Sequence, residues 1–233
     1  MNQELDFVKE MFDKIAPKYD FLNRLLSMRQ DVYWRREMVK AAQLKSDAAV
    51  LDAACGTCDV GLEVSRFLKG RTSITGLDFS FGMLALGKRK LSGPRGRAIC
   101  LVNGDALNLP VRDQQFDAGF MAFGIRNIMN RTGAMKEFYR TLKPGGRIII
   151  LELTTPQKGL MRRLYLLYFQ KILPIIGSFF SKHGNAYAYL PESVLKFPDP
   201  VSFANQMKAA GFKDIRFKEM TLGIVTLFVG IKL

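Results

Sequence analysis

The stretch Val50-Leu-Asp-Ala-Ala-Cys-Gly-Thr-Cys-Asp59 decides the fold of this chain. It is an apolar run that ends at Asp52 and breaks into a turn containing Gly56, which is how a nucleoside-binding βα unit begins. A second apolar run ends at Asp78, 22 residues after Gly56, which is the distance at which such folds place a carboxylate on a ribose diol. A third run is followed by Asp105. The pattern therefore predicts a nucleoside site at the ends of three neighbouring strands.

The composition of this loop indicates which nucleoside it holds. A dinucleotide fingerprint needs three glycines to seat a pyrophosphate on a helix N-terminus, whereas this loop has one, Gly56, flanked by Cys55 and Cys58. The loop also carries Asp52 and Asp59, and negative charge suits a cationic ligand that has no phosphate. We therefore expect S-adenosylmethionine (AdoMet), with its sulfonium and amino groups, in preference to NAD.

The chain offers few metal ligands. Cys55 and Cys58 form one CxxC pair, no second pair exists, and His183 is the only histidine. A four-ligand zinc site is therefore not expected, and a redox or metal role for the pair is kept as a minor alternative. Because the three cysteines form no disulfide framework and the N-terminus shows no signal peptide, we expect a cytoplasmic protein without a metal.

Length and charge bound the remaining possibilities. With 233 residues, 48% of them hydrophobic, the chain is most simply a single domain over residues 1–233. An excess of 35 Lys and Arg over 21 Asp and Glu gives a net charge of +14, which favours an anionic membrane or nucleic acid as partner. The basic residues are scattered in short groups without a nucleic-acid module, so no nucleic acid is expected, and a solvated surface is the plain alternative.

Two kinds of hydrophobic periodicity divide the chain. Helical spacing over residues 4–15 and 19–42, broken at Pro17, predicts a helical cap of residues 1–45 that can form a lid. Alternating strands and helices then predict an α/β fold with a mainly parallel sheet covered on both faces. Two final strands without a helix between them predict an antiparallel hairpin on the sheet edge. The seven expected strands are 49–53, 73–78, 98–103, 116–122, 147–153, 213–220 and 223–231.

Several separated motifs occur in a fixed order along the chain. They are Tyr19-Asp-Phe-Leu-Asn23, Leu51-Asp-Ala-Ala-Cys-Gly-Thr57, Phe123-Gly-Ile-Arg-Asn127, Leu142-Lys-Pro-Gly-Gly-Arg147 and Tyr189-Leu-Pro-Glu-Ser193. Over nearly the whole chain they resemble the ubiquinone/menaquinone-biosynthesis C-methyltransferases, and the strand pattern is similar to the class I AdoMet-dependent methyltransferase fold. The resemblance implies C-methylation of a polyprenylated quinol, either demethylmenaquinol, a methoxy-benzoquinol or both. A methyltransferase for another small aromatic or lipid, one for nucleic acid, and a non-catalytic AdoMet-binding module stay open.

The resemblance also implies roles in the AdoMet site. Thr57 matches the family's loop threonine, and Asp78 matches the acid on the ribose hydroxyls. Asp105 and Ala106 match the pair at the adenine edge, although Asp105 taken alone is also an ordinary turn residue. A carboxylate accepts two hydroxyl donors or an amine, so these roles are chemically sound. The expected cofactor-binding residues are Asp52, Gly56, Thr57, Asp78, Asp105, Ala106 and Ala122.

Three positions depart from the family pattern. The family commonly has histidine where Asp31 stands, serine where Ala122 stands, and glycine or alanine where Cys58 stands. Losing the serine removes one hydroxyl from the AdoMet pocket, and losing the histidine alters the helical cap. Neither change touches the three acids, so AdoMet binding is still expected.

The expected reaction sets requirements for the catalytic residues. Methyl transfer to a ring carbon needs the adjacent hydroxyl ionised, the carbon in line with the methyl group, and water excluded. Arg126 is expected to stabilise the phenolate, because a guanidinium is a persistent positive charge and a poor base; a surface salt bridge is its ordinary alternative. Tyr187 joins Arg126 in the expected catalytic set. The proton acceptor is left open among Tyr19, Asp20, Tyr187, Tyr189, Glu152 and a water.

Residues 157–182 form an aromatic and aliphatic segment in which basic residues are interspersed. The segment belongs to a predicted helical insert of residues 157–198. Charges at Arg162, Arg163 and Lys171 leave no run of the roughly 20 apolar residues that a bilayer requires. A surface for anionic lipid head groups and a quinol tail is expected, with peripheral contact to the membrane inner face. A helix buried against the core, or against a partner in a homodimer, is the alternative.

Overall fold

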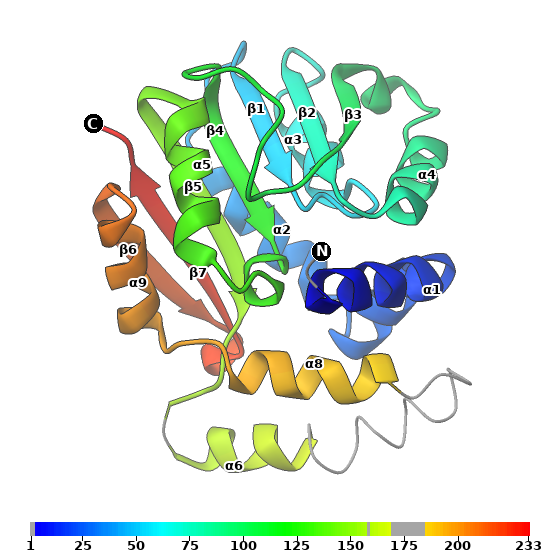
Figure 1. The fold of residues 1–233 in the computed structure, drawn as a ribbon, viewed down its shortest axis with the longest axis vertical. Helices are drawn as coiled ribbons and strands as arrows, with labels where there is room; N and C mark the ends of the chain where they lie inside the picture. Colours follow the sequence, from blue (N-terminus) through cyan, green and yellow to red (C-terminus); the bar gives the residue numbers. More distant parts are fainter. Residues whose placement is uncertain (1–2, 158, 169–184) are drawn as a thin grey trace.

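A seven-stranded sheet forms the centre of the computed structural model, which describes residues 3–157, 159–168 and 185–233 (Figure 1). The strand order is β3-β2-β1-β4-β5-β7-β6. The strands are β1 Ala49–Ala53, β2 Ser73–Asp78, β3 Ile99–Asn103, β4 Phe116–Ala122, β5 Leu142–Leu153, β6 Lys213–Met220 and β7 Val225–Ile231. Strands β1 to β5 pair in parallel, and β7 lies antiparallel between β5 and β6. The mainly parallel sheet with a C-terminal hairpin is therefore confirmed.

Strand β5 is longer than the sequence pattern predicts. It begins at Leu142, five residues before the expected start, and so includes the predicted turn at residues 143–146. The amide of Gly145 donates to the carbonyl of Lys232 at 2.7 Å, and the amide of Lys232 donates to the carbonyl of Gly146 at 2.9 Å. These two bonds tie the turn to the last residues of the chain, which the local sequence does not reveal.

Helices cover both faces of the sheet and the carboxyl ends of its strands (Figure 1). They are α1 Gln3–Leu26, α2 Gln30–Ala41, α3 Asp59–Phe67, α4 Phe81–Lys90, α5 Arg131–Thr141, α6 Gly159–Leu167, α8 Asn185–Leu195 and α9 Pro200–Ala209. Short 3-10 turns are η1 Pro94–Ala98, η2 Ile125–Asn127 and η4 Thr221–Gly223. Figure 1 shows α1 lying across the ends of the strands, with α8 and α6 beyond it.

Helix α1 continues through Pro17, so the predicted break at that residue was wrong. The chain turns instead at Met28 and Arg29, whose φ values of 50° and 62° are left-handed and end the helix. Proline removes one backbone hydrogen bond, but α1 buries Val8 and Leu22 against the rest of the molecule. Packing of this apolar face therefore outweighs the local penalty.

The core consists of two apolar layers, one on each face of the sheet. Side chains alternate along each strand, so neighbouring residues enter opposite layers. One layer packs under α5 and α9 and includes Leu51, Leu77, Met121, Ile150, Phe138 and Phe203. The other packs under α2 and α3 and includes Val50, Ile74, Phe120, Ile149, Trp34 and Val64. Burial on both faces fixes where each strand ends, and the end of each strand fixes where the following loop begins.

Candidate active site

A small cavity of about 80 Å³ lies where β1, β2, β3 and β4 end. Five of the seven predicted cofactor residues line it: Gly56, Asp78, Asp105, Ala106 and Ala122. Their strands are neighbours in the sheet, and parallel strands end at the same edge. The sheet therefore gathers residues that lie up to 66 positions apart in the sequence.

Asp78 organises this cavity. Its side chain is buried, and its two oxygens accept the amides of Gly56 at 2.7 Å and Ser80 at 2.9 Å. Burial raises the pKa of Asp78, while these two amide bonds oppose the rise. Gly56 has a φ of +54°, which a residue with a side chain rarely adopts. Each carboxylate oxygen can accept a further donor, so the site suits the two hydroxyls of a ribose.

Asp105 begins the opposite wall of the cavity. One of its oxygens accepts the amide of Leu107 at 2.9 Å, which is the turn geometry typical of aspartate. Ala106 is buried beside it. The carboxylate therefore shapes its own turn and still has its second oxygen for an amine donor, as the adenine role requires.

Asp52 and Thr57 do not line this cavity. Asp52 lies beneath the loop, where Oδ2 accepts the amide of Gly61 at 3.1 Å and Oδ1 has no partner among the described residues. Burial is the main cause that raises the pKa of Asp52 to about 7; the charge of nearby Asp78 adds to the rise, and the amide of Gly61 opposes it. Asp52 therefore supports the start of α3 rather than contacting the cavity.

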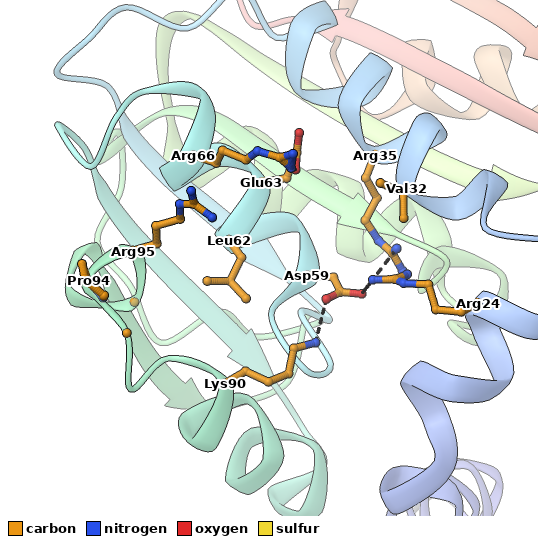
Figure 2. A pocket seen from close by; sticks show the side chains of 12 residues that line it. Arg24, Val32, Arg35, Asp59, Leu62, Glu63, Arg66, Lys90, Pro94 and Arg95 are labelled. Atoms are coloured by element: carbon orange, nitrogen blue, oxygen red, sulfur yellow. Dashed lines mark hydrogen bonds and ion pairs between the residues drawn. The ribbon is translucent and has the colours of Figure 1, made fainter.

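Thr57 belongs to a polar network that joins the helical cap to the loop. Its hydroxyl donates to Asp20 of α1 at 2.6 Å, and Lys90 of α4 lies 2.7 Å from Asp20 and 2.6 Å from Asp59. Figure 2 shows Lys90 approaching Asp59 from one side and Arg24 from the other. Asp20, one of the residues considered as a base, is thus engaged by an ion pair. Asp59 is surrounded by cations, so its charge is not free for a ligand.

Asp31, which stands where the family commonly has histidine, is buried in the same region. Its carboxylate contacts Arg35 at 2.5 Å, Arg24 of α1 and the hydroxyl of Ser27. Arg35 also lies 3.4 Å from Asp59. An aspartate at this position therefore pairs with the arginines that connect α1, α2 and α3.

Helix α1 closes the small cavity. Val8, Phe12 and Tyr19 of α1 line it together with the loop residues. Ligand pockets for molecules of this size measure roughly 300–1,000 Å³, so about 80 Å³ does not hold AdoMet with α1 in this position. The residues suit AdoMet, and α1 in this position leaves less room than the cofactor needs. The lid stays a prediction.

A second, mostly apolar cavity of about 660 Å³ lies on the other side of α1. It is bordered by α1, α2, α6 and α8, and Arg126 is among its few charged residues. Phe12, Tyr19 and Phe123 line both cavities. The two cavities therefore share one aromatic wall and adjoin each other.

Arg126 is buried and held firmly by the protein. Its Nη1 donates to Glu152 at 2.8 Å and to the carbonyl of Phe123 at 2.6 Å. Its own amide donates to the second oxygen of Glu152 at 3.1 Å. Nε is buried without a partner in the described part of the chain. The guanidinium thus has a donor left for an oxyanion, and Glu152 is bound too closely to Arg126 to serve as a free base.

The phenols near Arg126 differ in their surroundings. Tyr19 is fully buried, and burial raises its pKa although Arg126 opposes the rise, so it stays protonated at neutral pH. Tyr189 donates to Oδ1 of Asn127 at 3.1 Å, which connects α8 to the turn carrying Arg126. The side chain of Tyr187 lies outside the described residues.

The cysteine pair is close but deeply placed. The sulfur atoms of Cys55 and Cys58 lie 3.7 Å apart, and both side chains are buried. The contact with Cys58, together with burial, raises the pKa of the Cys55 thiol. Within the residues that the structure describes, no group of three or more His, Cys, Asp or Glu side chains is placed to hold a metal.

The fold and the two adjoining cavities define the class of this protein, an AdoMet-dependent methyltransferase of class I. Comparison with known families then places it further. The chain belongs to the ubiE/COQ5 methyltransferase family, whose model matches residues 1–232.

Curated relatives match over almost their full length. The chain is 47% identical over 227 residues to the ubiquinone/menaquinone biosynthesis C-methyltransferase UbiE of Geotalea daltonii, covering 97% of this chain and 96% of that protein. It is 44% identical over 225 residues to the demethylmenaquinone methyltransferase of Deinococcus radiodurans, covering 97% and 92%. Among solved structures, a methyltransferase of Thermotoga maritima described as a possible histamine N-methyltransferase superposes with a TM-score of 0.67 at 21% identity, covering 96% and 99%. That likeness shows the fold alone.

Replacing Asp78 tests the AdoMet site. Asp78→Ala should weaken AdoMet binding at least tenfold, because charge-assisted bonds to two ribose hydroxyls contribute about 1.5–3 kcal/mol each. Titration calorimetry measures the affinity, with Asp113→Ala, an exposed surface carboxylate paired with Arg140, as control. An unchanged affinity in Asp78→Ala, or tighter binding of NAD than of AdoMet by the wild type, contradicts the assignment.

Burial of Asp52 predicts a pH dependence of stability. The folded-state pKa of about 7 exceeds the ordinary value of 3.8, so between these values the folded protein binds more protons than the unfolded chain. The free energy of unfolding should therefore fall as pH rises from about 4 to 7, by at most about 1.4 kcal/mol per unit. Denaturant titrations at pH 5 and pH 8 should show a smaller fall in Asp52→Asn, and equal falls in both proteins count against a buried, protonated Asp52.

Proposed function

We propose that this methyltransferase transfers a methyl group from AdoMet to a ring carbon of a polyprenylated quinol in quinone biosynthesis. The names of its relatives support C-methylation and point to demethylmenaquinol, a methoxy-benzoquinol or both. In this proposal residues 1–233 form a single domain. The cap of residues 1–45 closes over the donor, and the insert of residues 157–198 borders the acceptor.

One observation carries the proposal: Arg126, a largely buried arginine with an unpartnered Nε among the described residues, lines an apolar cavity that adjoins the cavity proposed for AdoMet. Arg126 Nε has no partner among the described residues, and the cavity around it is lined mainly by Leu, Ile, Met and aromatic side chains. A polyprenylated quinol combines two ionisable ring hydroxyls with a long hydrocarbon chain. The arginine suits one hydroxyl, and the apolar lining suits the ring and the chain.

The chemistry follows from this arrangement. AdoMet supplies an electrophilic methyl group on a cationic sulfonium. Arg126 would stabilise the negative charge of the ring oxygen, which directs electron density to the adjacent carbon. That carbon would bond to the methyl group as the sulfur–methyl bond breaks, which leaves S-adenosylhomocysteine, and the ring carbon would then lose its proton to water. The apolar walls and the cap helix exclude water, so the attraction between these charges is not screened. The shared wall of Phe12, Tyr19 and Phe123 limits the separation of the two reactants.

Tyr187 stays a proposed catalytic residue beside Arg126. Asn127, held by Tyr189, is in place to orient a ring hydroxyl or a water. Tyr19, buried and protonated, serves this scheme as a wall and hydrogen-bond donor. In this proposal a water held at Arg126 accepts the proton, and Tyr187 is the alternative.

The rim of the apolar cavity suits a membrane surface. Leu25 of α1, Met28 of the turn after α1 and Leu164 of α6 line the cavity and are exposed, with Met28 83% exposed, so the cavity opens here. Arg162 and Arg163 of the same helix α6 are exposed and line a separate hollow. No helix in the described ranges is long and apolar enough to cross a membrane. We propose a cytoplasmic enzyme that touches an anionic inner face peripherally, and a homodimer through α6 is the alternative use of this surface.

Another small aromatic or lipid acceptor is the second candidate, because the cavity selects for an apolar ring with a hydroxyl rather than for a particular quinone. Nucleic acid is not expected, because the cavity beside Arg126 is apolar. Quinone profiling of a deletion strain, with mass spectrometry of ligands bound to the purified protein, separates these candidates. Accumulation of an unmethylated quinone precursor supports the proposal, and an unchanged quinone profile contradicts it.

Replacing Arg126 tests its role in turnover. Arg126→Ala should lower kcat about a hundredfold, the scale of losing one oxyanion donor, with AdoMet affinity nearly intact. Lysine should restore activity only in part, because it lacks the planar group. Arg147→Ala, which removes a guanidinium bonded to the carbonyl of Ala42, is the control. Normal turnover in Arg126→Ala, or a loss of AdoMet binding that matches the loss of activity, excludes this role.

Charge replacement tests the membrane contact. Arg162→Gln with Arg163→Gln should reduce binding to anionic liposomes about tenfold at low salt, and neutral liposomes should bind weakly throughout. Lys69→Gln with Arg71→Gln removes the same charge from an exposed turn at the other end of the strands and should have little effect. Activity on a long-tailed quinol should fall in the α6 variant, while activity on a short-tailed analogue is kept. Equal loss on both substrates indicates a folding or dimer role, and salt-sensitive RNA binding without a liposome preference favours the nucleic-acid alternative.

A further inference from the structure

Glu152 carries a fully buried carboxylate at the end of β5. Its Oε1 accepts Nη1 of Arg126 and the amide of Leu153, both at 2.8 Å, and its Oε2 accepts the amide of Arg126 at 3.1 Å. A buried carboxylate is stable only when it is paired and hydrogen-bonded, and this one has both. Because its strand lies inside the sheet between β4 and β7, the carboxylate has a fixed position.

This fixed carboxylate determines which edge of the Arg126 guanidinium is free. Nη1 donates one hydrogen bond to Glu152 and one to the carbonyl of Phe123, so both of its hydrogens are engaged within the protein. Nε remains buried and without a partner among the described residues, and Arg126 lines the apolar cavity. The N–H donors of a guanidinium lie in one rigid plane, so holding one nitrogen in place also fixes the direction of the other N–H groups.

We propose that Glu152 is a positioning residue for methyl transfer, which holds Arg126 so that its free donor meets the ionised ring oxygen of the acceptor. This inference rests on the proposed function of the apolar cavity. Glu152 does not itself touch the acceptor, because it is fully buried and does not line the cavity. It acts through Arg126.

Glu152 also sets the charge of the site. Two guanidinium groups, Arg126 and Arg131, lie within its electrostatic influence, so the cluster of two cations and one anion carries one net positive charge. Removing the negative charge makes the site more positive and should favour ionisation of a ring hydroxyl at lower pH. The charged and titratable groups that act on Arg126 or Glu152 are Tyr19 of α1, Arg131 of α5, Tyr165 of α6 and Tyr189 of α8.

Two substitutions separate position from charge. Glu152→Gln keeps the length of the side chain and removes its charge, whereas Glu152→Asp keeps the charge and withdraws the carboxylate by one methylene. Both should lower kcat at least tenfold, about the scale of a misplaced oxyanion donor, with the KM for AdoMet within about twofold of wild type. The rise of kcat with pH should have its midpoint about one pH unit lower in Glu152→Gln than in wild type. In Glu152→Asp the midpoint should be unchanged.

A buried polar neighbour provides the matched control. Thr226 of β7 is the register partner of Glu152, and its hydroxyl bonds to Thr154 at 2.8 Å. Thr226→Val also disturbs a buried polar group at this end of the sheet, so it should lower stability and leave the kcat and the pH profile unchanged. If Thr226→Val changes kcat and the pH profile as much as the Glu152 variants do, Glu152 has only a packing role and the proposal is wrong. The proposal is also wrong if the Glu152 variants keep the wild-type kcat.

A binding measurement gives a readout that needs no turnover. 2-Methyl-1-naphthol, bound together with S-adenosylhomocysteine, reports its ionisation by absorbance during a pH titration. Its apparent pKa should be lowered on wild type, lowered further on Glu152→Gln and restored toward the free value on Arg126→Gln. If Glu152→Gln does not fold, Glu152→Asp must still show lower kcat with the wild-type naphthol pKa. Naphthol that binds wild type and Glu152→Gln with the same pKa contradicts the inference alone, whereas naphthol that does not bind wild type contradicts both the inference and the proposed function.

Discussion

The parallel register between β1 and β2 is the constraint on which the cofactor site depends. Ala53 lies opposite Leu77, so the two strands end side by side. The ladder continues one step further through the amide of Cys55, which donates to the carbonyl of Leu77 at 2.9 Å. This bond brings Gly56 to the carboxylate of Asp78. A slip of one residue would turn Asp78 to the other face of the sheet and separate it from the loop.

Buried charges connect the helical cap to this sheet. Desolvated carboxylates are costly alone, and two of them, Asp31 and Glu152, are paired with arginines. Arg24 and Arg35 contact both Asp31 and Asp59, which fixes α1 and α2 against the start of α3. Asp52 and Asp78 have backbone amide donors instead, and no salt bridge joins either to a cation among the described residues. The pKa of Asp52 rises to about 7.

The position of α1 serves both cavities at once. Phe12 and Tyr19 form part of each lining, and Asp13 anchors the same helix to Ser80 and Gly82 just after β2. In the proposed function, a helix shared in this way links admission of the donor to the shape of the acceptor cavity. It would also keep water away from the space between them, where a cationic donor and an anionic acceptor meet.

The sequence by itself determined the order of the strands along the chain, the acids that follow them and the arginine that lines the apolar cavity. These follow from local signals: apolar runs of strand length, a glycine turn and spaced motifs. It did not determine that α1 continues through Pro17, because packing of Val8 and Leu22 decides that. Only the tertiary structure decided which carboxylates contact the cavity and which support it. Asp52, Asp78 and Glu152 each lie at or near a strand end, and their roles differ because burial and hydrogen-bond partners come from segments distant in sequence.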